Sequence, residues 1–213
     1  MAYAIIAFDG PDPSRRAAVR DRHLGVITDW ARDGRLALGV PLFDAAWQPV
    51  GSLMVVSAGD PSGLDAYLAA EPFATDGVWA RWTAHPGRIA PLPYRPLPQP
   101  GTPVSPTRTH TVMLALDGTD DGALARRMAV REAHMARVRG KAADGTLALG
   151  CALLDAPDGR MIGSVTVTAH DSDEAARAFW NADPYVTGGV WQEITMWGTR
   201  FAPLPYQPLP GAA

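Results

Sequence analysis

The stretch RRAAVRDRH at residues 15–23 recurs almost unchanged as RRMAVREAH at residues 126–134, an offset of 111. The match continues in register, because DGRLALG at 33–39 returns as DGTLALG at 144–150. After one inserted residue the offset becomes 112, and APLPY at 90–94 returns at 202–206. A period above about 100 residues is too long for a solenoid repeat, so each copy should be a small domain. The chain is a duplicated domain.

The duplication also sets the domain boundaries. The first copy should occupy residues 1–98 and the second residues 108–213, each long enough to bury its own core. The segment QPGTPVSPT at 99–107 lacks apolar periodicity and is rich in Pro, Gly, Ser and Thr. Such a composition predicts a stiff, extended linker.

Within each copy the apolar spacing predicts the order strand, helix, strand, strand, helix, strand. The long first helix should carry His23, Val26 and Trp30 on one face, and Ser62 with Asp65 should form a capping box for the second helix, which Glu71-Pro72 ends. This order is the ferredoxin-like split βαβ plan, an α+β fold. The expected elements are 3–8, 15–33, 36–43, 52–57, 62–71 and 78–84 in the first copy, and 111–116, 124–143, 147–154, 164–169, 172–181 and 190–196 in the second.

Several expected strands are apolar on both faces. Ile5-Ile6, residues 53–56 and residues 112–114 are continuous apolar runs, whereas a half-exposed strand would alternate. The natural cover for the open face of each sheet is the sheet of the other copy. We therefore expect an intramolecular pseudo-dimeric α+β barrel with four helices outside, compact as a monomer, although further homo-oligomers are compatible with this plan.

Composition restricts the possible partners and locations. The 213 residues are 47% hydrophobic and 19% charged with a formal net charge of −3, so no general attraction to nucleic acid or to an anionic membrane is expected. No apolar run approaches the roughly 20 residues of a membrane helix, and no signal peptide is visible, so cytoplasm is the expected location. The single cysteine, Cys151, is expected to be a buried strand thiol, and Lys141 is the only lysine available for Schiff-base chemistry.

Two histidines are candidates for acid-base chemistry, because only His23 and His134 are kept by the repeat. A histidine on the apolar face of a helix is by default a core residue. Its retention in both copies, three residues after Arg20 and Arg131, indicates a functional role as strongly as a core role. Arg20 and Arg131 are accordingly candidates for binding substrate. Imidazole is also the side chain best suited to proton transfer near neutral pH.

A second feature kept by the repeat follows the second helix of each copy. It reads Glu71-Pro72-Phe73 in the first copy and Asp183-Pro184-Tyr185 in the second. On the structural interpretation the carboxylate and proline end the helix and the aromatic ring fills the core. On the functional one the carboxylate orients the histidine and fixes its tautomer, while Tyr185 supplies a phenol that Phe73 cannot.

Tryptophan is abundant, with seven residues in the chain. Trp79 and Trp191 are equivalent in the repeat and are expected to pack in the core. Tryptophans without a counterpart are better candidates for an asymmetric ligand wall: Trp30, Trp82, Trp180 and Trp197.

Taken together, Arg-x-x-His on the first helix, Asp-Gly-x-Leu before a glycine-containing strand, and Asp-Pro-Tyr before Gly-Val resemble the YCII-related proteins of the dimeric α+β barrel superfamily. The resemblance covers about residues 3–90 and 111–202. It implies a barrel made of two units, and an active pair formed by His134 and Asp183 in the second copy, with His23 as the equivalent histidine in the first. Glu71 and Phe73 depart from the family pattern. Family members with an assigned reaction suggest cofactor-free lyase or dehydrohalogenase chemistry on oxygenated aromatic rings, and related barrels include isomerases, polyketide cyclases and cofactor-free monooxygenases.

The resulting hypothesis is an enzyme that needs no cofactor and acts by elimination, isomerisation or cyclisation on an apolar, cyclic or polyketide-like molecule. His134 would be the base or acid, Asp183 its orienter and Tyr185 a proton donor. The alternatives are a non-catalytic ligand-binding or regulatory module and a cofactor-free monooxygenase. No bound metal is expected, because each copy offers only a histidine and a carboxylate whereas a catalytic zinc usually takes three protein ligands. The first site should be the weaker, because Glu71 could not hold His23 in the same geometry as the shorter Asp183 holds His134 without a shift of about 1 Å, and because Phe73 lacks the hydroxyl of Tyr185.

Overall fold

The computed structural model describes residues 1–212, in which the two copies fold as the same βαββαβ unit. One short helix is added in each copy, directly after the second long helix, so six helices rather than four cover the barrel. The first copy contains β1 (Ala2–Asp9), α1 (Pro13–Arg32), β2 (Leu36–Phe43), β3 (Pro49–Ser57), α2 (Pro61–Ala70), α3 (Pro72–Thr75) and β4 (Trp79–Ile89). The second contains β5 (His110–Asp117), α4 (Ala123–Ala143), β6 (Leu147–Leu154), β7 (Met161–Thr168), α5 (Asp173–Asn181), α6 (Pro184–Thr187) and β8 (Trp191–Thr199).

Several local boundaries differ from the expected ones, and two of the differences concern α2 and β4. Asp60 caps α2, since its side chain accepts from the Gly63 N–H at 3.2 Å and from the Ser62 hydroxyl at 2.6 Å. The capping box predicted from Ser62 and Asp65 is therefore wrong. Strand β4 continues beyond the expected residue 84 to Ile89, because its last residues pair with the second copy.

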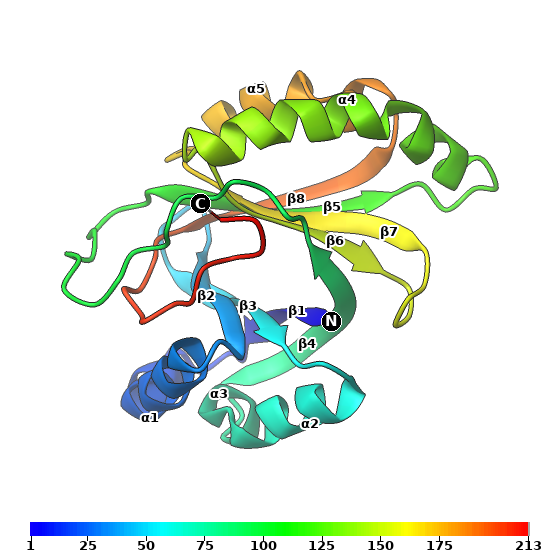
Figure 1. The fold of residues 1–213 in the computed structure, drawn as a ribbon. Coiled ribbons are helices and arrows are strands. Elements are labelled where there is room, and N and C mark those ends of the chain that lie inside the picture. The colour runs from blue at the N-terminus through cyan, green and yellow to red at the C-terminus, as the bar shows by residue number, and fades with distance from the viewer. Residues whose placement is uncertain (213) are drawn as a thin grey trace.

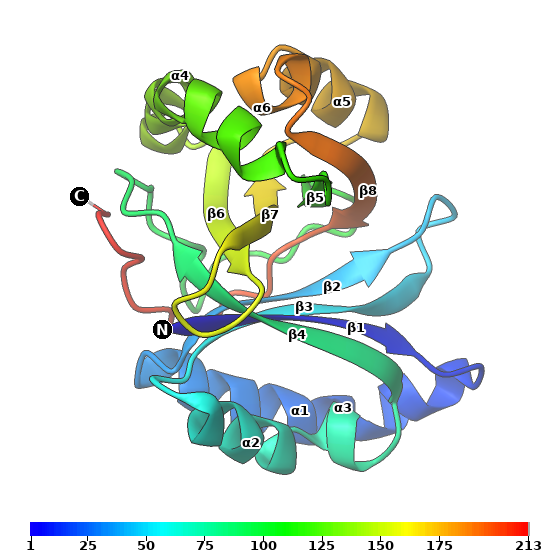
Figure 2. The same ribbon diagram turned by 90° about the vertical axis from the view of Figure 1, so that its right-hand side faces the viewer.

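The eight strands form one closed antiparallel barrel in the order β1-β3-β2-β8-β5-β7-β6-β4. Each copy contributes one four-stranded half, and Figures 1 and 2 show the two halves facing each other with the helices on the outside. The inner surfaces are apolar and the side chains of Ile6, Leu53 and Val165 are almost completely buried. The fused pseudo-dimeric barrel expected from the apolar strands is confirmed. Within residues 1–212, no helix has the length and apolar character required to cross a bilayer.

The two seams of the barrel are unequal. At one seam β4 pairs with β6 through three residues, from Gly87–Leu153 to Ile89–Cys151. At the other, β2 and β8 pair only at Phe43–Gly198. The first-copy counterpart of Ala152 is Pro41, which has no backbone N–H to donate across the seam. The seam between β2 and β8 is therefore the shorter of the two.

The repeated APLPY segments leave their own copy and lie on the other one. The hydroxyl of Tyr206 donates to the Gly39 carbonyl at 2.9 Å and accepts from the Gly39 N–H at 3.3 Å. Tyr94 makes the equivalent pair of contacts with Gly150, at 3.2 and 3.1 Å. Each copy therefore supplies a segment that completes the surroundings of the other copy's first helix and second strand.

Candidate active site

Both repeated histidines are hydrogen-bonded to the carboxylate that follows the second helix of the same copy. His23 Nδ1 lies 2.7 Å from Glu71 Oε1, and His134 Nδ1 lies 2.8 Å from Asp183 Oδ1. Both carboxylates are fully buried, and the two histidines are 7% and 8% exposed. The structure thus brings together the two pairs that the repeat singled out.

The carboxylates also begin the short helices α3 and α6. Glu71 Oε1 accepts from the Phe73 N–H, and Asp183 Oδ1 from the Tyr185 N–H, both at 2.9 Å. The helix-cap interpretation and the histidine-orienting one therefore describe the same carboxylates.

Although Glu71 is longer than Asp183 by one methylene, it makes the same contact with its histidine, and the weaker activity expected of the first site stays a prediction. The backbone ψ is 111° at Glu71 and 139° at Asp183, so the extra methylene is absorbed by a local adjustment. The histidine–carboxylate distance consequently differs by only 0.1 Å, from 2.7 to 2.8 Å.

The second oxygen of each carboxylate has a different partner in each copy. Tyr67 donates its hydroxyl to Glu71 Oε2 at 2.9 Å. In the second copy the position of Tyr67 is Phe179, and Arg137 approaches Asp183 Oδ2 at 3.4 Å while its guanidinium lies 4.3 Å from the centre of the Phe179 ring. The two copies therefore stabilise the buried carboxylate by different donors.

An aromatic ring covers one face of each histidine. Phe73 is stacked on His23 with ring centres 3.9 Å apart, and Tyr185 on His134 at 3.8 Å. Arg16 and Arg127 lie on these aromatic rings, at 4.7 and 4.5 Å from the ring centres. Stacking explains why this position is aromatic in both copies even though only Tyr185 has a hydroxyl.

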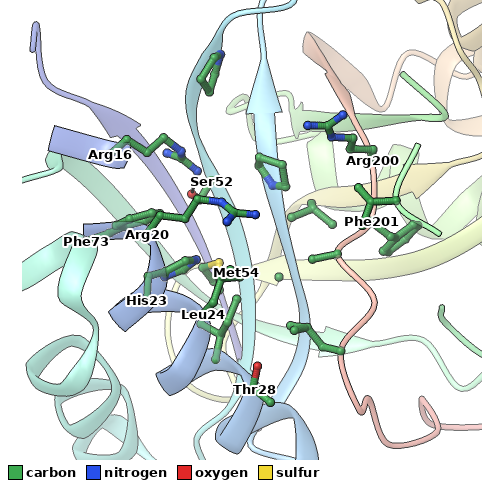
Figure 3. A pocket seen from close by; sticks show the side chains of 18 of the residues that line it. Arg16, Arg20, His23, Leu24, Thr28, Ser52, Met54, Phe73, Arg200 and Phe201 are labelled. Carbon is green, nitrogen blue, oxygen red and sulfur yellow. Dashed lines mark hydrogen bonds between the residues drawn. The ribbon is translucent and has the colours of Figure 1, made fainter. Parts of the chain in front are cut away.

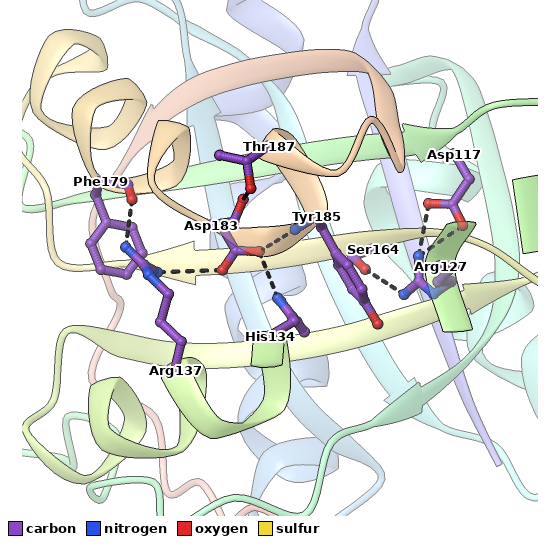
Figure 4. Close-up of polar contacts among 9 residues, drawn as sticks. All are labelled: Asp117, Arg127, His134, Arg137, Ser164, Phe179, Asp183, Tyr185 and Thr187. Carbon is purple, nitrogen blue, oxygen red and sulfur yellow. Dashed lines mark hydrogen bonds and ion pairs between the residues drawn. The ribbon is translucent and has the colours of Figure 1, made fainter. Parts of the chain in front are cut away.

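Arg16 and Arg127, which lie on these aromatic rings, each form an ion pair with an aspartate. Arg127 bonds both oxygens of Asp117 at 2.7 and 2.8 Å and Ser164 at 3.1 Å, as Figure 4 shows. Arg16 makes the same contacts with Asp9 and Ser52 in the first copy. These ion pairs hold the arginines against the stacked rings. Because a carboxylate balances each guanidinium, Arg16 and Arg127 have little charge left to attract a ligand.

The geometry leaves one ring nitrogen of each histidine for a ligand. The carboxylate engages Nδ1 and so favours the tautomer whose Nε2 can accept a proton. Burial raises the pKa of Tyr185, so its phenol stays protonated at neutral pH and can act as a donor. Each pair thus has the geometry that a general base and an orienting carboxylate would require.

A cavity lies beside each histidine, and both copies build its walls. The first, of about 650 Å³, lies between α1 and strands β2 and β3 and is closed by residues 200–204 of the second copy. Figure 3 shows His23, Met54 and Phe201 around it. The second, of about 200 Å³, lies between α4 and strands β6 and β7 and is closed by residues 88–92 of the first copy. Only the first has the size typical of sites for drug-sized ligands.

The structure divides the other residues expected at the site. Arg20 lines the first cavity, and Arg131 and Trp180 line the second. Trp30, Trp82 and Trp197 lie outside both. Trp30 packs edge-on against Tyr67, Trp82 is exposed on β4, and Trp197 contacts Phe8. Of the four tryptophans expected to form a ligand wall, Trp180 alone is part of the wall of either cavity.

Sequence reasoning missed the residues that each cavity receives from the other copy. Arg88 and Arg200 are equivalent in the repeat and stand two residues before the repeated APLPY segments. Their retention in both copies was a visible signal. Trp191, expected to be packing, also lines the second cavity, as does Cys151, whose pKa burial raises to about 12. The thiol is therefore protonated at neutral pH.

Comparison with known proteins identifies relatives of both copies. The family model of the YCII-related domain matches residues 1–85 and again 111–200. Protein YciI of Escherichia coli O6:H1 is 34% identical over 91 residues, which is 40% of this chain and 90% of the length of YciI.

Solved structures resemble the whole chain. A proposed monooxygenase from Lactobacillus acidophilus NCFM superposes with a TM-score of 0.59 at 10% identity, covering 94% of this chain and 92% of the other. The chlorite dismutase of Candidatus Nitrospira defluvii, in complex with imidazole, gives a TM-score of 0.52 at 14% identity over 94% and 91%. At these identities the likeness establishes the fold, the dimeric α+β barrel.

Proposed function

Because the chain belongs to the YCII-related family, whose model matches most of both copies, we propose that it is an enzyme that moves protons on a small, largely apolar and cyclic molecule without a bound cofactor. The reaction class is elimination, isomerisation or cyclisation. In each of these reactions a base removes a proton from carbon and an acid returns one elsewhere or assists a leaving group.

The observation that carries this proposal is the buried histidine–carboxylate pair beside a cavity. His23 and His134 are held by fully buried carboxylates, and the side chain of each histidine is part of a cavity wall. A buried carboxylate stabilises the imidazolium that forms when the histidine accepts a proton. The histidine is therefore equipped to act first as a base and then as an acid.

The two sites differ in what they add to this pair. Tyr185 brings a protonated phenol to the second site, whereas the first site offers the larger space. We propose that the first site receives the bulkier substrates, because its cavity of about 650 Å³ is larger than the cavity of about 200 Å³ beside His134.

Proton exchange tests the proposal before a substrate is known. Cyclic ketones and hydroxylated aromatics are incubated with the protein in D₂O, and loss of acidic C–H signals is followed by NMR. We expect wild-type protein to accelerate exchange in some of them and the variant His23→Asn/His134→Asn to be slower by about 10² to 10⁴. His170→Asn is the control, since His170 lies outside both cavities. Equal exchange in the double variant and the wild type would refute acid-base catalysis at these histidines and leave a ligand-binding module.

A further inference from the structure

The wall of the first cavity is mainly apolar, with arginines and a few neutral polar side chains such as Thr28 and Ser52. Leu24, Met54, Phe201 and Leu204 supply apolar wall, and the described part of the chain contributes no acidic side chain to the lining. The protein as a whole has a formal net charge of −3. A cavity that collects arginine and excludes carboxylates in an acidic protein selects for negative ligands.

Two arginines of this cavity have guanidinium groups available for a ligand. Arg20 extends from α1, and Arg200 extends from the opposite wall, which belongs to the second copy, as Figure 3 shows. Among the residues that the structure describes, Arg20 forms an ion pair only with the solvent-exposed Asp21, at 4.0 Å. Arg200 is half-buried and donates at 2.6 Å to the carbonyl of Ser105, a neutral acceptor. A guanidinium has five N–H donors, so most of those on Arg200 remain for a ligand.

In the second copy the equivalent arginine, Arg88, forms an ion pair with a carboxylate. Arg88 donates to Asp158 at 3.0 Å, and the side chain of Arg88 is more than half exposed. The residue equivalent to Asp158 in the first copy is Trp47, which carries no charge. Arg200 lies 5.8 Å from the centre of the Trp47 ring and 5.5 Å from that of Phe43. Of the two equivalent arginines, Arg88 is therefore paired with a carboxylate, whereas the charge of Arg200 is available to a ligand.

We propose that the first cavity binds apolar anions: molecules with a hydrophobic ring or chain that carry one oxyanion such as a carboxylate. Arg200 and Arg20 hold the charge, and the apolar body lies against Met54 and Leu24 near His23. This inference rests on the proposed function, because it names the substrate class of the same site. The cavity volume of about 650 Å³ accommodates a molecule of several fused or linked rings.

A pair of fluorescent probes separates charge from hydrophobicity. 8-Anilinonaphthalene-1-sulfonate carries one sulfonate, and N-phenyl-1-naphthylamine is the same ring system without it. A charged hydrogen bond contributes about 1.5–3 kcal/mol, so Arg200→Gln should weaken binding of the sulfonate probe by about 10- to 100-fold. Binding of the neutral probe should stay within about twofold. Arg88→Gln, the matched variant of the second copy, should change neither by more than about twofold.

Competition tests the ligand chemistry directly. 2-Naphthoate should displace the sulfonate probe, and 2-naphthamide, which lacks the charge, should displace it at least tenfold less well. Equal displacement by both, unchanged sulfonate binding in Arg200→Gln, or equal losses in Arg200→Gln and Arg88→Gln would overturn the anion site. His23→Asn separates the two proposals, because it should abolish proton exchange at this site while sulfonate binding stays within about threefold. Unfolding midpoints of all variants exclude misfolding as the cause of a loss.

Discussion

Trp47 and Asp158 occupy the same position of the repeat, and both have left-handed backbone, with φ of 59° and 57°. Asp tolerates this conformation better than most residues, whereas tryptophan requires compensation from its surroundings. Trp47 stacks on Phe43 with ring centres 3.9 Å apart and donates its indole N–H to the Pro106 carbonyl at 3.1 Å. The turn is thus preserved while its side chain changes from a carboxylate to an apolar ring.

This relationship predicts that anion binding can be weakened without substituting an arginine. Trp47→Asp should place a carboxylate near Arg200, as Asp158 is placed near Arg88, and should weaken binding of 8-anilinonaphthalene-1-sulfonate by about 3- to 10-fold. Trp47→Asn is the matched control, because it also tolerates left-handed backbone and loses the same ring, but adds no charge. Fluorescence titration compares the two variants. Equal affinities of Trp47→Asp and Trp47→Asn for the sulfonate probe would show that the charge at this position has no influence.

The architecture was predictable because the repeat encodes it twice. The RRxAVRxxH stretch predicts a helix, and the strands that are apolar on both faces predict a sheet covered by the sheet of the other copy. The structure confirms all three features. The register between the copies was not predictable. It depends on pairing at Ile89–Cys151 and Phe43–Gly198, which are contacts between residues far apart in the chain.

The candidate site was predictable in its histidine pairs and not in its walls. His23 and Glu71 share a pattern with His134 and Asp183, so comparison of the two copies found both pairs. Arg200 reaches the first cavity only because the chain crosses from β8 to the other copy. The periodicity of a sequence predicts each helix or strand separately. It does not predict which segment of the second copy will lie beside the first cavity.

The crossing segments should contribute unequally to stability. Tyr206→Phe removes the one hydroxyl that bonds both backbone groups of buried Gly39, and an unsatisfied buried group costs about 1–3 kcal/mol. Tyr94→Phe should cost less, because the Gly150 carbonyl also accepts from the Ala90 N–H at 2.9 Å. Urea denaturation of both variants measures the free energy of unfolding. A larger loss in Tyr94→Phe than in Tyr206→Phe would contradict this ranking.

The two ways of stabilising the buried carboxylate should be interchangeable. Tyr67→Phe leaves Glu71 Oε2 without its hydroxyl donor in a fully buried site and should lower the free energy of unfolding by about 1–3 kcal/mol. Val26 is the first-copy equivalent of Arg137, one helical turn after the histidine. Tyr67→Phe/Val26→Arg reproduces the second copy and should recover part of the loss. Val26→Arg alone is the control, and a double variant no more stable than Tyr67→Phe would show that the arrangements cannot be exchanged.

Acid should destabilise the fold through His110. Burial lowers the pKa of this histidine to about 4, with a smaller effect from neighbouring His170, and its Nδ1 lies 2.8 Å from the Thr109 hydroxyl. The unfolded chain takes up this proton near pH 6.5 and the folded chain only near pH 4, so the unfolded state binds more protons between these values. The free energy of unfolding should therefore be fully retained above about pH 6.5 and fall as the pH drops towards 4, by at most about 3 kcal/mol from this group.

His110→Asn removes the titrating ring, and we expect it to flatten the decline between about pH 6.5 and pH 4. Urea denaturation across this range measures the slope, and NMR titration of the His110 ring in wild-type protein measures its pKa independently. The interpretation requires both results. An unchanged slope in His110→Asn, or a His110 pKa near the ordinary value of about 6.5, would assign the acid sensitivity to other groups.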